Sequence, residues 1–295
     1  MTVQTKEVTL NDISFSSEKI DLEAIKTCYD EFGCFVIKGF NKKYVEPIHS
    51  DIQKIVKESY GMLNAGGYTE TDVGRITENG AIFLPAHKAS QHDRQIMTVP
   101  INYKNSAAFC RSAFDERVIE INTTLLGPNV ELFMEGQALY KEPGGGHPKK
   151  LHQDSSYFEH KYEGPLAQLT YAIDTDFERG ALHVVPGSHK SGLLEHTTTF
   201  SHLGLDEKEW TLDKAVCIEG KAGDAIFFHV NCIHGSPENH SDVARPVFIN
   251  RWRRADDFIV AGGTMAHNRK DNQQKTKQAR EYNMMIAGYR EGGLG

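Results

Sequence analysis

The stretch LHQDSSYF at residues 151–158 places His152 and Asp154 one residue apart. In an extended strand successive side chains point to opposite faces, so His152 and Asp154 are expected to project to the same side while Gln153 points away. Imidazole and carboxylate groups together suit a borderline metal ion such as iron or zinc. One short strand is therefore predicted to supply two metal ligands.

A third ligand must come from another strand, and His234 is the candidate. The turn signal at residues 223–224 and the apolar run at residues 225–228 predict a buried strand that delivers His234 at its far end. Two imidazoles and one carboxylate on one face of a metal ion leave about three coordination positions free, an arrangement typical of non-haem Fe(II) oxygenases. The residue types therefore favour iron over zinc.

These residues also have simpler explanations. The chain contains 14 histidines, and a histidine is often a hydrogen-bonded residue of the core. His229 is an alternative to His234 as the metal ligand. Cys232 is a candidate sulfur ligand for zinc, but Asp154 already completes a set of three.

A single arginine, Arg245, follows His234 by eleven residues. A guanidinium presents a planar fork of donors that pairs with both oxygens of a carboxylate, so Arg245 is a candidate carboxylate clamp beside the metal, or else an ordinary surface charge. If residues 246–253 form a strand, Arg251 shares a face with Arg245 and favours a substrate that bears an acid group. The alternative is that residues 251–254 form a solvated strand end. Gln137 is a second candidate for a substrate-facing side chain.

Four motifs occur in a fixed order along the chain. They are residues 151–158, residues 180–190 (GALHVVPGSHK), residues 223–236 ending in His234-Gly235-Ser236, and Arg245. In this order they resemble the phytanoyl-CoA dioxygenase family of 2-oxoglutarate-dependent oxygenases. The resemblance extends from about residue 30, where EFGCFVIKGF at residues 31–40 is similar to the family's opening helix-to-strand step, to about Arg254.

The resemblance implies Fe(II) as cofactor, with 2-oxoglutarate and O₂ as cosubstrates. The residues that it implies are His152, Asp154 and His234 for iron, Arg245 and Ser236 for the distal carboxylate of 2-oxoglutarate, and Lys141 near the same cosubstrate. It favours His234 over His229, because His234 alone precedes Gly-Ser. Relatives that halogenate lack the carboxylate, so the presence of Asp154 disfavours halogenation.

The expected function is oxidation, by hydroxylation, of an aliphatic C–H bond in a small-molecule substrate, with release of succinate and CO₂. Desaturation, epoxidation and ring formation use the same oxidant and are not separated from hydroxylation by the sequence. Two alternatives come from other classes of protein. One is a zinc-dependent hydrolase with the same three ligands, and the other is a non-catalytic barrel that binds a small ligand.

The composition argues against a nucleic-acid-binding protein, a membrane protein and a secreted protein. The net charge of −7 and the pI near 6.1 give no basic footprint for nucleic acid, and no apolar stretch approaches the roughly 18 residues of a membrane span. Residues 1–20 are polar and do not resemble a signal peptide. Five cysteines form no C-x-x-C pair, which favours free thiols and a cytoplasmic location. An oligomer is possible but is not indicated by the sequence.

The expected fold is mainly β with flanking helices, a double-stranded β-helix (jelly-roll or cupin-like barrel). Periodicity by itself indicates only a sandwich or a barrel, and the resemblance implies the specific topology. Residues 1–295 are expected to form a single domain, because the candidate ligands must converge on one core.

Helices are predicted at residues 21–32, 45–60 and 106–126, with a further surface helix over residues 268–290. Strands are predicted at residues 34–38, 130–141, 166–173, 181–185, 215–218, 225–230 and 246–252. Glycines and weak periodicity at residues 61–95 and 144–146 predict two loops that act as lids, with plain loops as the alternative.

Overall fold

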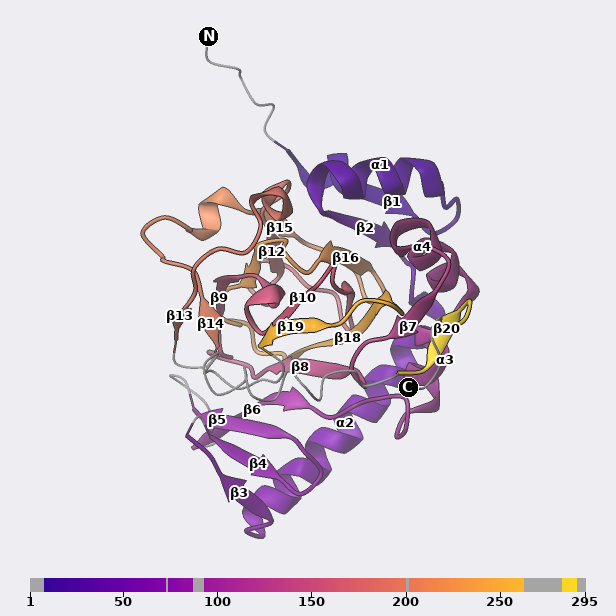
Figure 1. Cartoon of the computed structure of the whole chain (residues 1–295). Helices are drawn as coiled ribbons and strands as arrows, with labels where there is room; N and C mark the ends of the chain where they lie inside the picture. Colours follow the sequence, from indigo (N-terminus) through magenta and orange to yellow (C-terminus); the bar gives the residue numbers. More distant parts are fainter. Residues whose placement is uncertain (1–7, 73, 87–92, 200–201, 263–282, 291–295) are drawn as a thin grey trace.

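The computed structural model describes residues 8–72, 74–86, 93–199, 202–262 and 283–290. Two β-sheets form the walls of a barrel, and the helices lie on the outside (Figure 1). Within the described ranges, no helix has the length and apolar character needed to cross a membrane. The predicted mainly β barrel with flanking helices is confirmed.

The larger sheet contains twelve strands and the smaller sheet contains four. In spatial order the larger sheet comprises β1 (Ser14–Ser16), β2 (Cys34–Lys38), β16 (Ala225–His229), β11 (Leu166–Tyr171), β18 (Arg245–Arg254), β8 (Gln137–Lys141), β6 (Arg94–Val99), β5 (Ile82–Pro85), β4 (Arg75–Thr77) and β3 (Tyr68–Glu70), with β7 (Val130–Leu132) beside β18 and β20 (Met285–Ala287) beside β7. The smaller sheet comprises β15 (Val216–Ile218), β12 (Leu182–Val184), β17 (His234–Ser236) and β9 (Lys149–His152). Two further ladders pair β10 (Phe158–His160) with β19 (Ile259–Gly262) and β13 (Thr197–Thr198) with β14 (Leu203–Gly204).

The helices are concentrated in the first half of the chain. They are α1 (Leu22–Phe32), α2 (Lys42–Asn64), α3 (Ala107–Ala113) and α4 (Glu116–Leu126), with short 3₁₀ turns η1 (Leu10–Ile13), η2 (Asp154–Ser156), η3 (Ser188–Ser191) and η4 (Leu212–Lys214). Helix α1 begins where the Asp21 carboxylate accepts a hydrogen bond from Ala24 N and ends at Gly33, which has a φ of 69°. Such caps satisfy the backbone groups that a helix end leaves free, so the predicted helix at residues 21–32 is confirmed.

Aromatic residues fill the outer face of the larger sheet. Phe35 on β2 and Phe227 on β16 are both fully buried and stack with their ring centroids 4.8 Å apart and an angle of 7° between the planes. Phe40 meets Phe227 edge-on, and Tyr29 of α1 meets Phe35 in the same way. Because these rings pack the sheet against the helix, the inner face is left to line the interior of the barrel.

The structure differs from several predicted elements. The helix predicted at residues 106–126 is two helices, because the Asp115 carboxylate accepts from Arg117 N and starts α4 as a new helix. The strand predicted at residues 130–141 is divided into β7 and β8 by a turn in which Met134 has a φ of 66°. Left-handed backbone of this kind cannot continue a strand.

Two predicted segments adopt regular structure instead. Residues 61–95, predicted to be a lid, contribute the end of α2 and strands β3 to β6, which extend the larger sheet; residues 73 and 87–92 lie outside the described part. Most of the predicted tail helix also lies outside it, but residues 285–287 form β20, which pairs with β7 and is not helical. The pattern of Lys, Gln and Arg in the tail gave no sign of this strand pairing.

Replacement of Phe227 by alanine should lower the free energy of unfolding by about 3–5 kcal/mol, because it leaves a cavity beneath α1 and removes the stack with Phe35. Urea unfolding followed by circular dichroism measures this change. The matched control is Phe177→Ala, since the Phe177 side chain is 52% exposed and should contribute less than about 0.5 kcal/mol. Equal effects of the two substitutions would contradict this account of the core.

Candidate metal and carboxylate site

Strand pairing brings the first and third candidate ligands together. In the smaller sheet β9 runs antiparallel to β17, and His152 lies directly opposite His234. Paired residues of neighbouring strands share a face, so both imidazoles project to the same side. Their ring centroids are 4.4 Å apart. Residues 82 positions apart in the sequence therefore meet through a single ladder.

The Asp154 carboxylate completes a cluster of three. Its Oδ1 lies 3.8 Å from His152 Nε2 and 3.7 Å from His234 Nε2, and the three donor atoms all lie within 4.8 Å of one another. All three side chains are buried, with exposures of 6–8%. Donors at these separations can each reach the roughly 2.0–2.2 Å that nitrogen and oxygen ligands keep from an ion. Asp154 itself begins the η2 turn rather than continuing the predicted strand.

Backbone carbonyls orient both imidazoles. His152 Nδ1 lies 2.8 Å from the carbonyl oxygen of Lys150, and His234 Nδ1 lies 2.9 Å from that of Cys232. A carbonyl only accepts, so each Nδ1 carries the proton and each Nε2 presents a lone pair toward the cluster. Second partners of this kind fix the tautomer of metal-binding histidines.

Burial keeps both imidazoles in the neutral form that binds a metal. Burial, assisted by the neighbouring His234, lowers the pKa of His152 to about 3. Burial also lowers the pKa of His234, although Asp154 acts in the opposite direction. Two neutral imidazoles and an aspartate form a donor set that fits a divalent transition metal.

Arg251 holds the other oxygen of Asp154. Its Nη2 donates to Asp154 Oδ2 at 3.1 Å, and both side chains are buried. Burial alone would raise the pKa of Asp154, but Arg251 and the two histidines outweigh burial, so this pKa is lowered. The sequence predicted an inward Arg251, and the guanidinium does lie inside the barrel. Its charge is engaged by Asp154, which leaves the predicted contact with a substrate acid group without support from this geometry.

Arg245 is a buried cation with room for an anion. Its side chain is 2% exposed, its Nη2 donates to the carbonyl oxygen of Gly180, and its Nε has no hydrogen-bond partner. In the part of the chain that the structure describes, no carboxylate lies within ion-pair distance of it. Burial lowers its pKa to about 10, which is the response of a cation that lacks a partner charge. An anionic ligand would supply the missing acceptor.

Lys141 and Ser236 lie beside this arginine and the triad, respectively. Lys141 pairs with Arg245 across β8 and β18, and its Nζ donates to the carbonyl oxygens of His147 at 2.5 Å and Pro237 at 2.6 Å. Burial, together with the Arg245 charge, lowers its pKa.

Ser236 is buried two residues after His234, so both side chains are on the same face of β17. Gln137 pairs with Ile249 at the other end of β8 and is half-buried.

The two alternative metal ligands considered from the sequence, His229 and Cys232, contact other groups. His229 Nε2 lies 3.7 Å from the Glu163 carboxylate, and its Nδ1 accepts from Asn231 N. The Cys232 sulfur lies 3.9 Å from both Ser188 Oγ and the Val185 carbonyl oxygen. Neither residue belongs to the cluster around Asp154.

Gln153 has a structural role that the sequence did not reveal. It points away from the cluster, as the alternation of the strand predicted, and is fully buried. Its Nε2 donates to the carbonyl oxygens of Gly192 and Asn231, while its Oε1 accepts from Leu194 N. The side chain therefore ties two surrounding segments, residues 192–194 and Asn231, to the backbone between His152 and Asp154.

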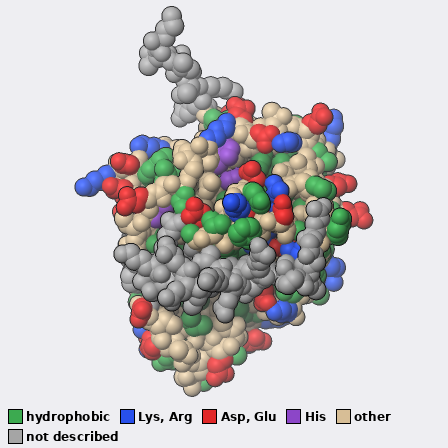
Figure 2. Space-filling view, viewed as in Figure 1, with side chains coloured by type: hydrophobic (Ala, Val, Ile, Leu, Met, Phe, Trp, Pro, Cys, Tyr) green, Lys and Arg blue, Asp and Glu red, His purple; other side chains and the backbone are tan. Residues whose placement is uncertain are grey.

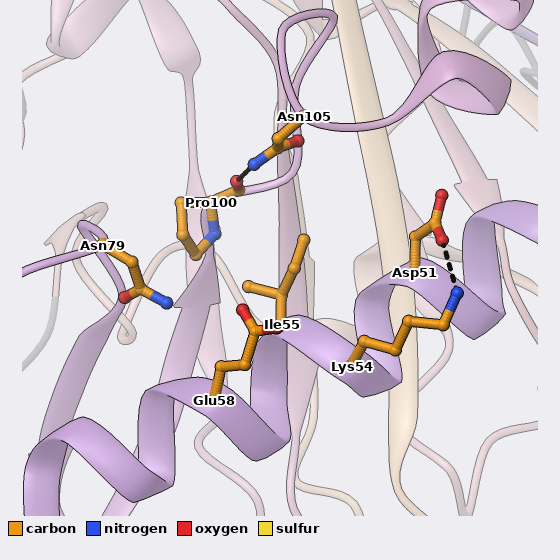
Figure 3. A pocket seen from close by; sticks show the side chains of 7 residues that line it. All are labelled: Asp51, Lys54, Ile55, Glu58, Asn79, Pro100 and Asn105. Carbon is orange, nitrogen blue, oxygen red and sulfur yellow. Dashed lines mark hydrogen bonds and ion pairs between the residues drawn. The ribbon is translucent and has the colours of Figure 1, made fainter.

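A separate surface hollow, of about 220 Å³, contains none of these residues (Figure 3). It is lined by Asp51, Lys54, Ile55, Glu58, Asn79, Pro100 and Asn105.

On the face shown in Figure 2, basic and acidic side chains of the described residues are interspersed rather than gathered into a basic patch.

The metal-free protein should lose stability as the pH falls from 6.5 toward 4. The unfolded chain binds a proton at His152 with an ordinary pKa, whereas the folded chain does not until about pH 3, so acid favours unfolding. In urea titrations, His152→Gln should reduce the slope of unfolding free energy against pH by about 1.4 kcal/mol per pH unit. His160→Gln is a second case, because burial lowers the pKa of His160 to about 4. An unchanged slope in both variants would contradict the assignment of neutral buried histidines.

Comparison with known proteins agrees with this geometry. A profile of the phytanoyl-CoA dioxygenase (PhyH) family matches residues 29–247. The chain is 28% identical over 155 residues to a probable alpha-ketoglutarate-dependent hypophosphite dioxygenase of Stutzerimonas stutzeri, covering 50% of this chain and 53% of that protein. It is 24% identical over 254 residues to the human peroxisomal phytanoyl-CoA dioxygenase, covering 81% of this chain and 71% of that protein.

Solved structures share the fold. The non-heme monooxygenase ThoJ superposes with a TM-score of 0.64 at 16% identity, over 93% of this chain and 86% of ThoJ. The carbocyclase SnoK gives 0.58 at 18% identity, over 83% of this chain and 88% of SnoK. The epimerase SnoN, in complex with Fe³⁺, alpha ketoglutarate and nogalamycin RO, gives 0.53 at 19% identity, over 81% of this chain and 85% of SnoN.

The family match covers the three clustered ligands, Lys141, Ser236 and Arg245. It confirms the resemblance predicted from the sequence and, with it, the enzyme class of iron- and 2-oxoglutarate-dependent oxygenases. The chain belongs to the phytanoyl-CoA dioxygenase family.

Proposed function

We propose that this chain is an Fe(II)- and 2-oxoglutarate-dependent dioxygenase that hydroxylates an aliphatic C–H bond of a small-molecule substrate. One atom of O₂ enters the substrate as the hydroxyl oxygen, and the other enters succinate as 2-oxoglutarate loses CO₂. We also propose that residues 1–295 act as one catalytic domain. The cytoplasm is the proposed location, because all five cysteines are free thiols.

The observation that carries the proposal is that one barrel holds both a triad of metal-binding groups and the buried Arg245 guanidinium, which has no counter-ion among the described residues. A buried cation without a counter-ion is unfavourable unless a ligand supplies the opposite charge. The distal carboxylate of 2-oxoglutarate supplies it, in a geometry that a guanidinium recognises through two parallel hydrogen bonds. Ser236 and Lys141 would add donors to the same carboxylate.

The residues that would hold iron are His152, Asp154 and His234. The two imidazoles are already neutral and oriented by backbone carbonyls, so binding requires no proton release from them. Asp154 stays ionised because Arg251 lies against it. When bound, Fe(II) with 2-oxoglutarate and O₂ supplies the oxidant that cleaves the C–H bond.

The protein contributes orientation and exclusion of water. All the proposed iron and 2-oxoglutarate residues are buried, with exposures between 2% and 8%. Charge-assisted hydrogen bonds are stronger in such surroundings than in water, so the cosubstrate is held in one orientation. Asp154 occupies the position that halogenating relatives leave open, and this supports oxygen insertion over halogenation.

A zinc-dependent hydrolase with the same three ligands gives Arg245 no partner. Such a hydrolase also needs no group beside the metal that binds the carboxylate of a cosubstrate. A non-catalytic barrel explains neither the converging imidazoles nor the unpaired guanidinium. Family membership favours the oxygenase over both.

Replacement of Asp154 by alanine should weaken Fe(II) binding by more than about 100-fold and abolish succinate production, because one of three ligands is lost. Anaerobic calorimetry measures the affinity, and an assay of succinate measures turnover. Asp256→Ala is the matched control, since the Asp256 side chain is 60% exposed on the surface. Full activity of Asp154→Ala at saturating iron would overturn its proposed role.

Replacement of Arg245 by glutamine should raise the Kd for 2-oxoglutarate by about 30-fold or more, with Fe(II) affinity unchanged. Anaerobic addition of 2-oxoglutarate to the Fe(II) protein should produce a weak visible charge-transfer band, whose titration gives the Kd. Arg254→Gln, on the same strand but partly exposed, should behave like the unmodified protein. A protein that gives no such band with Fe(II) and 2-oxoglutarate is not an enzyme of this class.

A further inference from the structure

A β-bulge places a second lysine on the inner face of the smaller sheet. Between the pairs His152 with His234 and Lys149 with Ser236, β9 has one residue more than β17. The extra residue shifts the alternation, so Lys149 shares a face with His152 although the two are three positions apart. The glycine at 235 permits the close approach, because a Cβ there would lie 2.7 Å from the Lys149 carbonyl oxygen.

The neighbouring lysine shows the opposite environment. Lys150 Nζ lies 2.6 Å from the Glu207 carboxylate, and both side chains are substantially exposed, at 38% and 65%. Leu151 packs with Leu205 and Ile233 in an apolar cluster outside the barrel. Only Lys149 and His152 of this strand therefore face the interior.

The Lys149 ammonium has no counter-ion among the described residues. Its Nζ contacts Met97 Sδ at 3.1 Å, and no carboxylate of the described chain lies within ion-pair distance. Burial lowers its pKa to about 8, so the group remains mostly charged at neutral pH. Burial is the main cause of the lowered pKa of His202, and the Lys149 charge is the next. The Lys149 charge also helps to lower the pKa of Lys141 and of His152. Lys149 pairs with Ser236 across β9 and β17 and lies on the same strand as His152, so the ammonium is next to the proposed cosubstrate site.

The basic side chains that face the barrel interior differ in their exposure to solvent. Arg245 and Lys141 are 2% and 4% exposed. Lys149 and Met97 are only half-buried, so the Lys149 ammonium is more accessible than these two groups. Among the described residues, Arg245, Arg251 and Lys149 are cations of this site, and only Arg251 has a carboxylate, that of Asp154, within ion-pair distance. Because the charges of Fe(II) and 2-oxoglutarate cancel, the loaded site still favours one more anion.

We propose that Lys149 is a specificity residue that binds an oxyanion group of the substrate, a carboxylate or a phosphoryl group, beside the triad. This inference rests on the proposed function, since it assigns the substrate class of the same site. An ammonium is a compact point charge with three rotatable donors, so it accepts either kind of oxyanion. The anion would hold the substrate by one end and present its C–H bonds to the metal.

The test uses the full-length protein loaded with Fe(II) and 2-oxoglutarate without oxygen. The probes are propionate and methylphosphonate, with methyl propionate and dimethyl methylphosphonate as their neutral counterparts. Binding is followed by calorimetry and by the change in the charge-transfer band. The variants are Lys149→Met, which keeps the length and removes the charge, Lys149→Arg, which keeps the charge, and Lys150→Met as the matched control.

We expect at least one anionic probe to bind, its neutral ester to bind at least about tenfold more weakly, and Lys149→Met to weaken the anion by a similar factor. Lys149→Arg and Lys150→Met should retain binding. The preferred anion distinguishes a carboxylic from a phosphorus-containing substrate.

Three results would overturn the inference. They are no binding of either anion, equal binding by Lys149→Met, and a loss in Lys149→Met that affects 2-oxoglutarate instead of the probes. The band formed by Fe(II) and 2-oxoglutarate alone reports on the proposed function separately. If that band forms while the anions bind independently of Lys149, only the present inference fails.

Discussion

The site depends on the antiparallel pairing of β9 with β17. This ladder places His152 opposite His234, and the chain then turns at once into η2, which returns Asp154 to the same two imidazoles. The pairing also sets the bulge that turns Lys149 inward. Because a register shift of one residue moves every side chain to the other face, no other alignment of these strands gives the same cluster. The larger sheet then supplies Arg245 and Arg251 from a single strand, β18.

Charge inside the barrel is distributed unequally. Arg251 meets Asp154, and Arg253 meets the fully buried Glu131, so both are neutralised within the protein. Arg245 and Lys149 have no such partner in the described residues. Burying an unpaired cation costs several kcal/mol, and a fold tolerates this only where packing elsewhere is sufficient. The aromatic packing on the outer face of the larger sheet supplies that stability, which leaves the interior organised for ligands rather than for its own stability.

The sequence predicted the chemistry of the site better than its local geometry. His152, Asp154, His234 and Arg245 were recognisable because their residue types and order carry a chemical meaning. The strands were predictable from apolar runs, but their interruptions were not. Met134 adopts a left-handed conformation that its residue type does not announce, and Asp115 caps a new helix within an otherwise continuous helical pattern. Both depend on tertiary packing that periodicity does not contain.

The same limit explains why Lys149 is absent from the residues predicted to be functional. An unbroken strand places Lys150 and His152 on one face and Lys149 on the other, so the alternation selects the wrong lysine. The bulge that reverses this choice arises from pairing with β17 and from the glycine at 235, more than eighty residues away. A long-range pairing of this kind is visible only in three dimensions. The glycine next to His234 was part of the recognised motif, but its effect on β9 was not predictable from that motif.

The ion pair between Arg251 and Asp154 also bears on how Asp154 would bind a metal ion. Oδ2 of Asp154 is engaged by the guanidinium at 3.1 Å, while Oδ1 faces the two histidines at 3.7 and 3.8 Å. A carboxylate held in this way offers one oxygen to a metal ion instead of two. Three single-atom ligands would leave about three positions on a bound ion for a chelating cosubstrate and O₂. An aspartate free to rotate would be able to use both oxygens and occupy one of those positions. Within the proposed function, Arg251 would therefore be a positioning residue that limits how Asp154 binds the metal ion.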